Sequence, residues 1–313
     1  MLGLSAMKGI VCLAVLSIGF VSGAFAEGAG QWTTGAPMLS ARSEVAVATV
    51  GGKVYVAGGF GGGRALEIYN PATDRWSRGA PVPRTLHHGA AVGIGGKLYL
   101  VGGFADGWNP VDSVYEYDPK LDRWRARASL PTARGALAAV SVDGKIHALG
   151  GMGPGGRNTP AHEMYDPGSN TWAERAPLPT PRDHLTAAVV RGHIYAIGGR
   201  IAGSYARNLT VNEEYDPATN SWGSRAPMPT ARSGIAAAVL EGEILVFGGE
   251  APSGTFDEVE AYDPETDKWT RYAPMPTARH GLGAAVLAGR VYVISGGTRP
   301  GGWASPLNEI FSR

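Results

Sequence analysis

Cysteine is almost absent from this sequence: Cys12 is the single one among 313 residues. It lies in an apolar run, Gly9–Phe25, that follows one lysine and ends in small residues, as a secretory signal peptide does. A retained membrane anchor is the alternative, but the run is short for a span of about 20 residues. We therefore expect cleavage of residues 1–26 and a mature chain, 27–313, that is secreted or periplasmic and inserts in no membrane. Without a thiol, that chain relies on its core for stability, which its length allows.

Helical periodicity and an excess of basic charge are also lacking. After residue 30 no amphipathic helix pattern occurs, so the chain is expected to be all-β. Charged residues make up 18% of the sequence and the net charge is +1, with no basic stripe of the kind that contacts phosphate backbones. We therefore expect no nucleic-acid partner. The 47 glycines and 22 prolines recur in register with apolar runs, which indicates turns and not disorder.

One pattern recurs six times along the chain, and residues 231–269 show it in full. A run of small residues is followed by a tight turn, an apolar run that ends in a glycine doublet, a variable loop, and a short strand that ends in Tyr-Asp-Pro or a close variant. A tryptophan stands seven residues after the tyrosine. The doublets begin at Gly58, Gly102, Gly150, Gly198, Gly248 and Gly296, which gives a period of 44 to 50 residues. Such a period is typical of a solenoid or a propeller.

Each repeat predicts four antiparallel strands. Pairs such as Gly51-Gly52 and Glu241-Gly242 between the two apolar runs favour a hairpin. Asx-Pro pairs such as Asp216-Pro217 end the third strand, because proline lacks the N–H that a strand ladder needs. The fourth strand carries the tryptophan. Six such units in one domain predict a six-bladed β-propeller.

The glycine doublets, with the tyrosine and tryptophan downstream of them, resemble the kelch-repeat family over residues 32–313. Five complete copies carry the pairs Tyr69/Trp76, Tyr117/Trp124, Tyr165/Trp172, Tyr215/Trp222 and Tyr262/Trp269, and a sixth copy is split between the two ends of the sequence. The resemblance implies a disc-shaped propeller that serves as a binding scaffold or, in some members, as an enzyme. A copper-radical oxidase similar to galactose oxidase is disfavoured, because that chemistry needs a cysteine cross-linked to a tyrosine. A ubiquitin-ligase adaptor of the kelch type is disfavoured too, because the predicted signal peptide stands where such adaptors carry a dimerisation domain.

The split copy predicts how the ring closes. The sixth copy has a third strand at 307–311 and no tryptophan after it, whereas Gln31-Trp32-Thr33 matches Lys268-Trp269-Thr270. We therefore expect the segment around Trp32 to form the outer strand of the sixth blade, so that no sheet edge stays open.

Residues that recur at the same place in each blade are expected to be structural. They include the tyrosines and tryptophans, the alanines of the innermost strands, and a recurring arginine. The arginine set is Arg42, Arg84, Arg134, Arg182, Arg232 and Arg279. His147 stands where other blades have Tyr55, Tyr99 and Tyr195, so it is expected in the core.

Specific function is expected where the six copies differ, in the loop after each doublet and at the start of the innermost strand. The loop candidates are Arg64, Trp108, Arg157, Arg200, Tyr205 and Trp303. Exposed arginines and aromatics on loops over a rigid scaffold are typical of recognition surfaces. Trp108 and Trp303 are the two tryptophans outside the repeat, and we expect them to face each other across blade one, beside Arg64. The alternative is that each ring covers the edge of its own blade.

A second group of candidates lies fourteen residues before the doublets. It comprises Glu44, His88 and His184, with Ala136, Gly234 and Leu282 in the other blades. A carboxylate and two imidazoles can bind a metal or move protons. Because they come from different blades and show no local ligand spacing, the sequence predicts a hydrogen-bonded polar rim, with no metal and no cofactor.

The chain is therefore expected to be an exported, monomeric, non-catalytic binding module that presents its loop face to a protein or a glycan. The alternative is a sugar mutarotase similar to the periplasmic sialic-acid epimerases, which are six-bladed kelch proteins. For that reaction Glu213, Glu214 and Arg207 lie close together in the sequence and would supply an acid, a base and an anion clamp.

Overall fold

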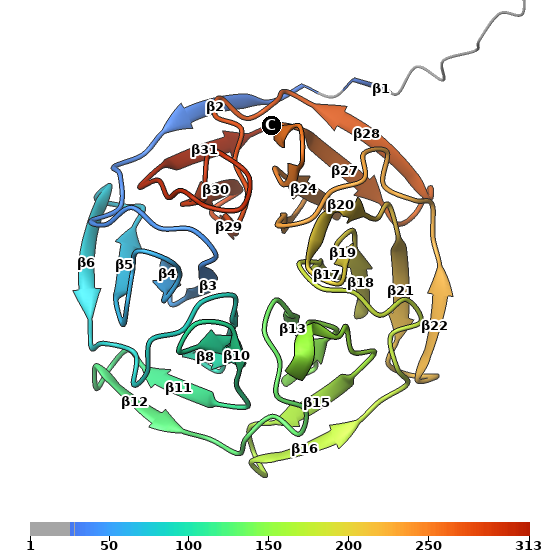
Figure 1. Cartoon of the computed structure of the whole chain (residues 1–313). Coiled ribbons are helices and arrows are strands. Elements are labelled where there is room, and N and C mark those ends of the chain that lie inside the picture. The colour runs from blue at the N-terminus through green and yellow to red at the C-terminus, as the bar shows by residue number, and fades with distance from the viewer. Residues whose placement is uncertain (1–25, 28) are drawn as a thin grey trace, which may run out of the picture.

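Six antiparallel sheets surround a central axis in the computed structural model, which describes residues 26–27 and 29–313 (Figure 1). The predicted all-β, six-bladed propeller is therefore confirmed. The predicted signal peptide, residues 1–26, lies outside the described part of the chain except for Ala26. Within that described part, no helix has the length and apolar character needed to cross a membrane.

Each blade has four strands, which follow one another from the axis outward. Blade one has β3 (Ala46–Val50), β4 (Lys53–Ala57), β5 (Leu66–Asn70) and β6 (Arg75–Gly79), and blade two has β7 (Ala90–Ile94), β8 (Lys97–Val101), β11 (Val114–Asp118) and β12 (Arg123–Ala126). Blade three has β13 (Ala138–Val142), β14 (Lys145–Leu149), β15 (His162–Asp166) and β16 (Thr171–Glu174), and blade four has β17 (Thr186–Val190), β18 (His193–Ile197), β21 (Asn212–Asp216) and β22 (Ser221–Ser224). Blade five has β23 (Ala236–Leu240), β24 (Glu243–Phe247), β27 (Val259–Asp263) and β28 (Lys268–Tyr272), and blade six has β29 (Gly283–Leu287), β30 (Arg290–Ile294), β31 (Asn308–Ser312) and β2 (Gln31–Thr34).

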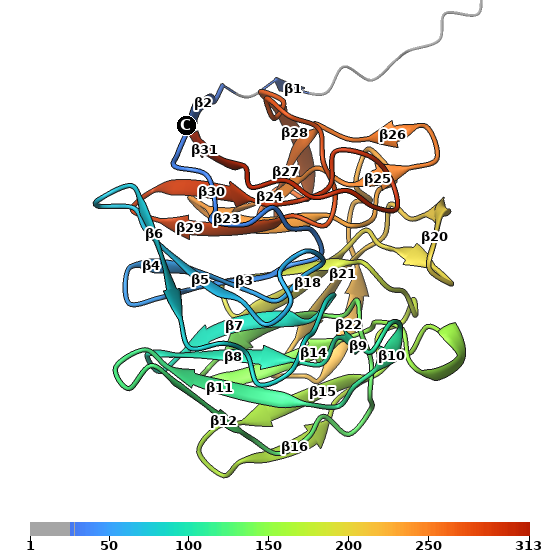
Figure 2. The same ribbon diagram turned by 60° about the vertical axis from the view of Figure 1, so that its left-hand side comes forward.

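The variable loops after the second strands carry short elements of their own. They are the hairpins β9 (Phe104–Ala105) with β10 (Asn109–Pro110), β19 (Arg200–Ile201) with β20 (Ser204–Asn208) and β25 (Glu250–Ala251) with β26 (Gly254–Thr255), and a 3-10 turn, η1 (Pro154–Gly156), in blade three. In Figure 2 the labels β9, β10, β20, β25 and β26 stand on one side of the ring. The variable loops therefore share one face of the propeller, which we call the loop face.

The hydrophobic core lies between neighbouring blades. One cluster, for example, joins Val92 and Val101 of blade two to Ile146 of blade three. The tryptophan of each repeat adds a polar link between blades, since its indole N–H donates to an alanine carbonyl of the neighbouring blade. Trp172, for instance, donates to Ala128 O at 2.9 Å. These rings are structural parts of the blade contacts, as the repeat pattern predicts.

The N-terminal strand closes the ring as expected. Strand β2 pairs with β31, with Trp32 opposite Phe311, and the two ring centroids are 5.2 Å apart. The Trp32 indole donates to Ala273 O of blade five at 3.0 Å, so the seam has the same link as the other blade contacts. The sequence did not predict β1 (Ala26–Glu27), which pairs in parallel with the outer strand of blade five, β28.

A buried arginine–glutamate pair lies inside five of the six blades. The pairs are Arg42–Glu67, Arg134–Glu163, Arg182–Glu213, Arg232–Glu260 and Arg279–Glu309, and all five arginine side chains are 0% exposed. In blade two, Leu86 and Tyr115 stand at these two positions. The assignment of Arg84 to the recurring set is therefore wrong. Arg84 lies two residues out of register, and its side chain is 42% exposed and pairs with Asp106.

The doublet of blade six begins one residue earlier than the sequence pattern indicates. Ser295 and Gly296 follow the end of β30, where the other blades have their two glycines. Both have positive φ, 67° and 108°, as the glycines of the other doublets do. Leu282 is therefore not the counterpart of Glu44 in blade six. That counterpart is Gly281, whose carbonyl accepts from the Glu44 N–H.

Two imidazoles of blade three form a buried pair that faces blade four. His147 Nδ1 lies 2.8 Å from His162 Nε2, and His162 Nδ1 lies 3.1 Å from Ala176 O. Because a carbonyl only accepts, His162 donates from Nδ1 to Ala176 and accepts at Nε2 from His147. Burial, together with Arg175, lowers the pKa of His147 to about 4, and burial, together with His147, lowers the pKa of His162 to about 3. The prediction that His147 is a core residue is confirmed, since it is 2% exposed.

We expect the free energy of unfolding to fall when the pH is lowered from 7 to 5.5. Both folded pKa values lie below the unfolded value of about 6.5, so the unfolded chain binds protons that the folded chain does not. Between pH 7 and pH 5.5 this loss amounts to about 1.2 kcal/mol for each imidazole, measurable by urea unfolding at the two pH values. The double variant His147→Tyr with His162→Asn copies Tyr195 and Asn212 of blade four and should lose less stability over this range. An equal loss of stability in the variant would show that His147 and His162 are not the source of the pH dependence.

Candidate functional site

Six backbone hydrogen bonds close a ring around the axis at the loop face. In each, the N–H of one residue donates to the carbonyl of its counterpart in the preceding blade, at 2.7 to 3.1 Å. The six residues are Glu44, His88, Ala136, His184, Gly234 and Gly281, and all have positive φ, between 52° and 65°. This left-handed conformation costs a non-glycine residue roughly 1–2 kcal/mol. Glu44, His88, Ala136 and His184 therefore stand where glycine would be more stable, and the first, second and fourth of these positions carry polar side chains.

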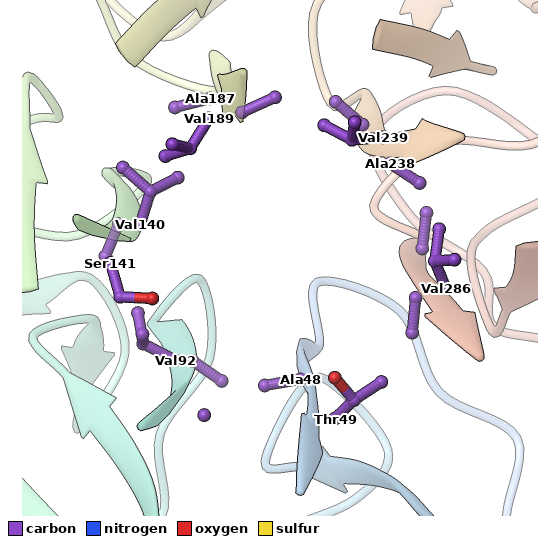
Figure 3. Close-up of a pocket in the computed structure, with 17 residues that line it drawn as sticks. Ala48, Thr49, Val92, Val140, Ser141, Ala187, Val189, Ala238, Val239 and Val286 are labelled. Atoms are coloured by element: carbon purple, nitrogen blue, oxygen red, sulfur yellow. The ribbon is translucent and has the colours of Figure 1, made fainter. Parts of the chain in front are cut away.

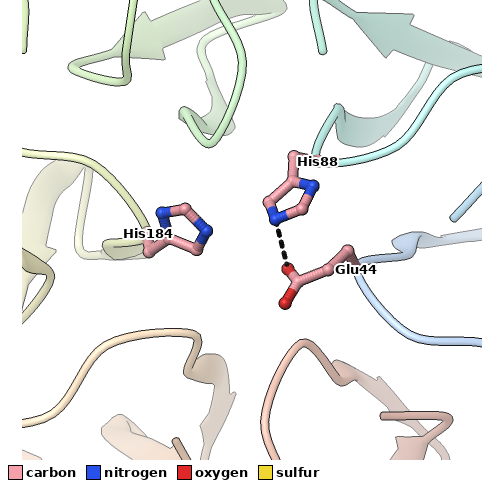
Figure 4. Close-up of side chains that lie close together, drawn as sticks. All are labelled: Glu44, His88 and His184. Atoms are coloured by element: carbon pink, nitrogen blue, oxygen red, sulfur yellow. Dashed lines mark ion pairs between the residues drawn. The ribbon is translucent and has the colours of Figure 1, made fainter. Parts of the chain in front are cut away.

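The three polar members of this ring point toward one another across the axis (Figure 4). His88 Nε2 lies 3.2 Å from Glu44 Oε2, and the rings of His88 and His184 have centroids 4.8 Å apart. Gly281 leaves the space for the carboxylate, since a Cβ at this position would lie 2.4 Å from Glu44 Oε1. The structure thus brings together a carboxylate and two imidazoles from three different blades.

Two further positions in each blade bring side chains to the same mouth. One directly precedes the ring residue, the other directly follows the doublet, and a β-bridge joins them in every blade. The bridged pairs are Ser43 with Phe60, His87 with Phe104, Gly135 with Met152, Asp183 with Arg200, Ser233 with Glu250, and His280 with Gly297. Charged or ionisable groups therefore come mainly from blades four to six, and aromatic side chains from blades one and two.

These side chains enclose a pocket of about 170 Å³, which we call the mouth pocket. Its lining consists of Ser43, Glu44, Phe60, His88, Trp108, Arg200, Gly203, Tyr205, Glu250, His280, Gly301 and Gly302. Phe60 and Trp108 meet edge to face, with centroids 5.9 Å apart, and the Tyr205 ring lies 5.8 Å from Arg200 Cζ. Aromatic rings beside a few converging ionisable groups are typical of a site for a small polar ligand.

A larger cavity, of about 410 Å³, occupies the opposite end of the central channel (Figure 3). Alanine, valine and glycine line it, with hydroxyl groups from Thr49 and Ser141 alone. None of its lining residues is ionisable, so this cavity offers no acid–base or charged-ligand chemistry. We therefore place the candidate site in the smaller mouth pocket.

Arg200 is the fixed cation of the mouth pocket. Its Nη1 donates to Glu250 Oε1 at 2.6 Å, and its Nε lies 3.3 Å from Asp183 Oδ1. His184 donates from Nδ1 to Asp183 at 2.5 Å and accepts at Nε2 from Arg200 Nη2 at 2.7 Å. Burial alone would raise the pKa of Asp183, but His184, Asn158 and the backbone N–H of Gly203 together outweigh burial and lower it. Arg200 is therefore already paired with two carboxylates.

A chain of two imidazoles fixes the proton positions next to Glu44. His87 Nε2 lies 2.7 Å from Gly107 O and therefore donates to it, which leaves His87 Nδ1 as an acceptor. His88 Nδ1, 2.6 Å away, donates to that atom, so His88 Nε2 carries a lone pair. Burial, with nearby His184 and His87, holds the pKa of His88 well below its usual value. At neutral pH the mouth pocket thus presents an uncharged imidazole acceptor beside the Glu44 carboxylate.

Five of the sequence-predicted candidates line the mouth pocket: Glu44, His88, Trp108, Arg200 and Tyr205. His184 lies beside them and holds Arg200. Trp108 is 55% exposed and packs with its ring 5.0 Å from that of His88. The two kinds of position that the sequence singled out, the loop after the doublet and the start of the innermost strand, therefore meet in one place.

The other three candidates lie outside the lining of the mouth pocket. Arg64 donates from Nε to Val82 O at 2.5 Å. Arg157 is exposed beside η1. Trp303 is 62% exposed and lies against Arg299, whose Cζ is 4.5 Å from the ring. Trp108 lines the mouth pocket and Trp303 does not. The two indoles therefore do not both lie at the pocket, in contrast to the expectation from the sequence.

The three residues suggested for a mutarotase do not form a site. Glu213 is buried and binds Arg182 at 2.6 Å inside blade four. Glu214 accepts from the Tyr195 hydroxyl at 2.6 Å on the opposite face of β21, because successive strand residues point to opposite faces. Arg207 is exposed on β20. This assignment of residues is therefore wrong.

Sequence reasoning missed four residues of the site: Phe60, Asp183, Glu250 and His280. Each stands at a position that directly precedes the ring residue or directly follows the doublet. An alignment of the six repeats on their doublets, with blade six shifted by one residue, exposes these positions as places where the copies differ in chemistry. The signal was present in the sequence, but the register that reveals it comes from the structure.

Comparison with known proteins agrees with the fold. The Kelch motif model matches residues 41–83, 86–131 and 133–179, and the KLHDC2/KLHL20/DRC7 Kelch-repeats domain model matches residues 177–312. A solved structure titled "Structure of YjhT" is similar, with a TM-score of 0.77 and 16% sequence identity, over 86% of this chain and 94% of that one. At this identity the likeness concerns the fold alone. No curated protein sequence matches the chain.

Proposed function

The chain belongs to the kelch-repeat family, and we propose that it is an exported binding module that holds a glycan in the mouth pocket. Propellers of this family commonly bind proteins, so binding is the role that family membership supports. The observation that carries the proposal is the meeting of aromatic rings from Phe60, Trp108 and Tyr205 with hydrogen-bond acceptors in one pocket. Sugar rings have apolar C–H faces that pack on aromatic rings, and hydroxyl groups that donate to carboxylates and neutral imidazoles.

The charge of the mouth pocket favours a neutral or amino sugar over an acidic one. Glu44, Asp183 and Glu250 supply three carboxylates around a single guanidinium, that of Arg200. The carboxylate of an acidic sugar would meet an excess of negative charge, and a hydroxyl or ammonium group would find acceptors.

A second candidate function is mutarotation of the bound sugar, and the Glu44–His88 pair favours it. Opening and closing a sugar ring needs one group that gives a proton and one that takes it. Glu44 Oε2 and His88 Nε2 lie 3.2 Å apart in the pocket. In this proposal His88 Nε2 takes the proton of the anomeric hydroxyl and passes it to Glu44 Oε2. Glu44 then gives the proton to the ring oxygen as the bond between that oxygen and the anomeric carbon breaks, and ring closure reverses these transfers.

The test begins with a glycan array that carries neutral, amino and acidic sugars, followed by calorimetric titration with the best binder. We expect retention of neutral or amino sugars. Trp108→Ala should weaken the affinity by about 2 kcal/mol, because it removes an aromatic contact at the pocket, and should change the stability by less than about 1 kcal/mol.

Trp303→Ala is the matched control, since Trp303 is a similarly exposed loop tryptophan outside the pocket lining. It should leave the affinity unchanged. Equal losses in both variants, or retention of acidic sugars alone, would contradict the pocket assignment. An array with no bound glycan would favour a protein partner on the loop face.

Exchange of the two anomers of the best-binding sugar, followed by NMR, separates enzyme from binding module. Acceleration that Glu44→Gln abolishes would support mutarotation. Tight binding without acceleration would support a non-catalytic module.

A further inference from the structure

We propose that Glu44, Glu250 and His280 form a binding site for a divalent transition-metal ion at the floor of the mouth pocket, with Zn²⁺ as the simplest case. One ligand atom from each residue lies within 4.8 Å of the other two, and all three residues line the pocket. They come from blades one, five and six, so no spacing in the sequence indicates them. The sequence predicted no metal because its polar candidates come from different blades and show no local ligand spacing, and Glu250 and His280 were not among those candidates.

The orientation of His280 is that of a metal ligand. Its Nδ1 lies 3.1 Å from Gly297 O, which only accepts, so Nδ1 carries a proton, and in the neutral imidazole Nε2 carries the lone pair. Metal-binding histidines commonly donate their second nitrogen to a backbone carbonyl in this way. Nε2 lies 3.5 Å from Glu44 Oε1 and 3.5 Å from Glu250 Oε2. The site therefore gathers three acceptors from side chains that are almost fully buried, an arrangement that a cation between them would stabilise.

Two of the three distances between these ligand atoms favour a metal ion over a proton or an ammonium group. Bonds of 2.0–2.2 Å to a tetrahedral Zn²⁺ place its ligand atoms roughly 3.3–3.5 Å apart. A charged hydrogen bond would bring two of them to about 2.7–2.9 Å. An ammonium nitrogen with hydrogen bonds of about 2.8 Å would hold its acceptors about 4.6 Å apart. The two distances of 3.5 Å fit the metal ion.

Glu250 is held in place for this role. Its Oε1 accepts from Arg200 at 2.6 Å, and its Oε2 accepts from the backbone N–H of Gly301 at 2.7 Å. Such hydrogen bonds around a ligating carboxylate orient it toward the metal. A carboxylate oxygen has a second lone pair, so Oε2 can accept from Gly301 and still bind an ion.

The neighbouring set of Glu44, His88 and His184 is the poorer site, although its ligand atoms also lie within 4.8 Å of one another. Both nitrogens of His184 are engaged, with Asp183 and with the guanidinium of Arg200. A dication there would lie beside a positive charge and would displace an existing hydrogen bond. The ion is therefore placed on the side of Glu44 that faces blades five and six.

Three protein ligands leave one coordination position of a tetrahedral ion open. Metal sites with three protein ligands use the fourth position for water or substrate, whereas structural sites have four. Because the three ligands line the mouth pocket, a ligand in that pocket can reach the open position. The metal site does not depend on the proposed glycan, and its test uses the metal alone. The preference for neutral or amino sugars applies to the metal-free pocket, because a bound dication would offset the negative charge of Glu44 and Glu250.

The experiment is a calorimetric titration of the purified, tag-free chain with Zn²⁺ after removal of metals with EDTA. We expect one ion per chain with a Kd below about 1 µM and a higher melting temperature in its presence. Glu44→Gln and His280→Asn should each weaken binding at least about 100-fold, with circular dichroism to show that both variants fold. His193→Asn is the matched control, because His193 lies 3.1 Å from Glu214 in a similar pair outside the pocket.

Several results would overturn the inference. One is that addition of Zn²⁺ gives no heat of binding and no rise in melting temperature. Another is that the folded variants Glu44→Gln and His280→Asn bind Zn²⁺ with the affinity of the natural chain. A third is that His193→Asn loses as much affinity for Zn²⁺ as these two variants do. Should one ligand variant not fold, the other provides the same measurement. Zinc binding without glycan binding would contradict the proposed function and leave this inference intact. Glycan binding without zinc binding would contradict this inference and leave the proposed function intact.

Discussion

Replacement of Arg182 by leucine is expected to lower the free energy of unfolding by about 3–5 kcal/mol, because it leaves Glu213 as a buried charge without its partner. Arg182 also donates to the carbonyls of Gly198 and Ala196, at 2.7 and 2.8 Å, and these acceptors lose their donor as well. Urea unfolding at pH 7 measures the loss.

Blade two supplies the compensating change. It has Leu86 and Tyr115 where the other blades have arginine and glutamate, so the double variant Arg182→Leu with Glu213→Tyr copies a pair that the fold already accommodates. Replacement of a buried ion pair by apolar residues is often neutral, and we expect the double variant to lie within about 2 kcal/mol of the natural chain. Arg84→Leu, at an exposed pair, should cost less than about 1 kcal/mol. A double variant as unstable as Arg182→Leu alone would show that the charge is not the cause.

Deletion of residues 27–35 is expected to destabilise the propeller by at least about 3–5 kcal/mol, the usual cost of removing a packed aromatic side chain. The deletion takes away β2, and with it Trp32, its contact with Phe311 and its hydrogen bond to Ala273. Strand β31 then becomes an open edge, which favours association between chains. Urea unfolding and sedimentation measure the two effects.

The control is deletion of residues 27–29, which removes Glu27 of β1 and keeps β2 whole. Since β1 forms only two residue pairs with β28, this deletion should change the unfolding free energy little. If both deletions had the same small effect, ring closure by β2 would contribute nothing to stability.

Much of the architecture was predictable from sequence because the rules that build it are local. A glycine pair between two apolar runs specifies a hairpin, an Asx-Pro pair ends a strand, and six copies of this unit specify the number of blades. Trp32, which supplies the tryptophan that the sixth copy lacks, also predicted which strand closes the ring. Positions predicted by counting residues from one repeat to the next were wrong where the repeat pattern itself changes. Arg84 lies two residues from the position that Leu86 occupies, and Ser295 replaces a glycine of the last doublet, which moved the predicted ring member from Gly281 to Leu282.

For the candidate site, the sequence by itself determined which kinds of position vary between blades, and therefore that Glu44, His88, Trp108, Arg200 and Tyr205 were candidates. Only the tertiary structure decided which of these meet. A closed ring brings together residues that are far apart in the sequence, and the left-handed backbone at the axis sets the direction of each side chain. Proton positions depend in the same way on carbonyls such as Gly107 O and Gly297 O, which no spacing along the chain reveals. The positions of the functional groups were therefore fixed by contacts between blades, whereas the blades themselves were fixed by contacts within a repeat.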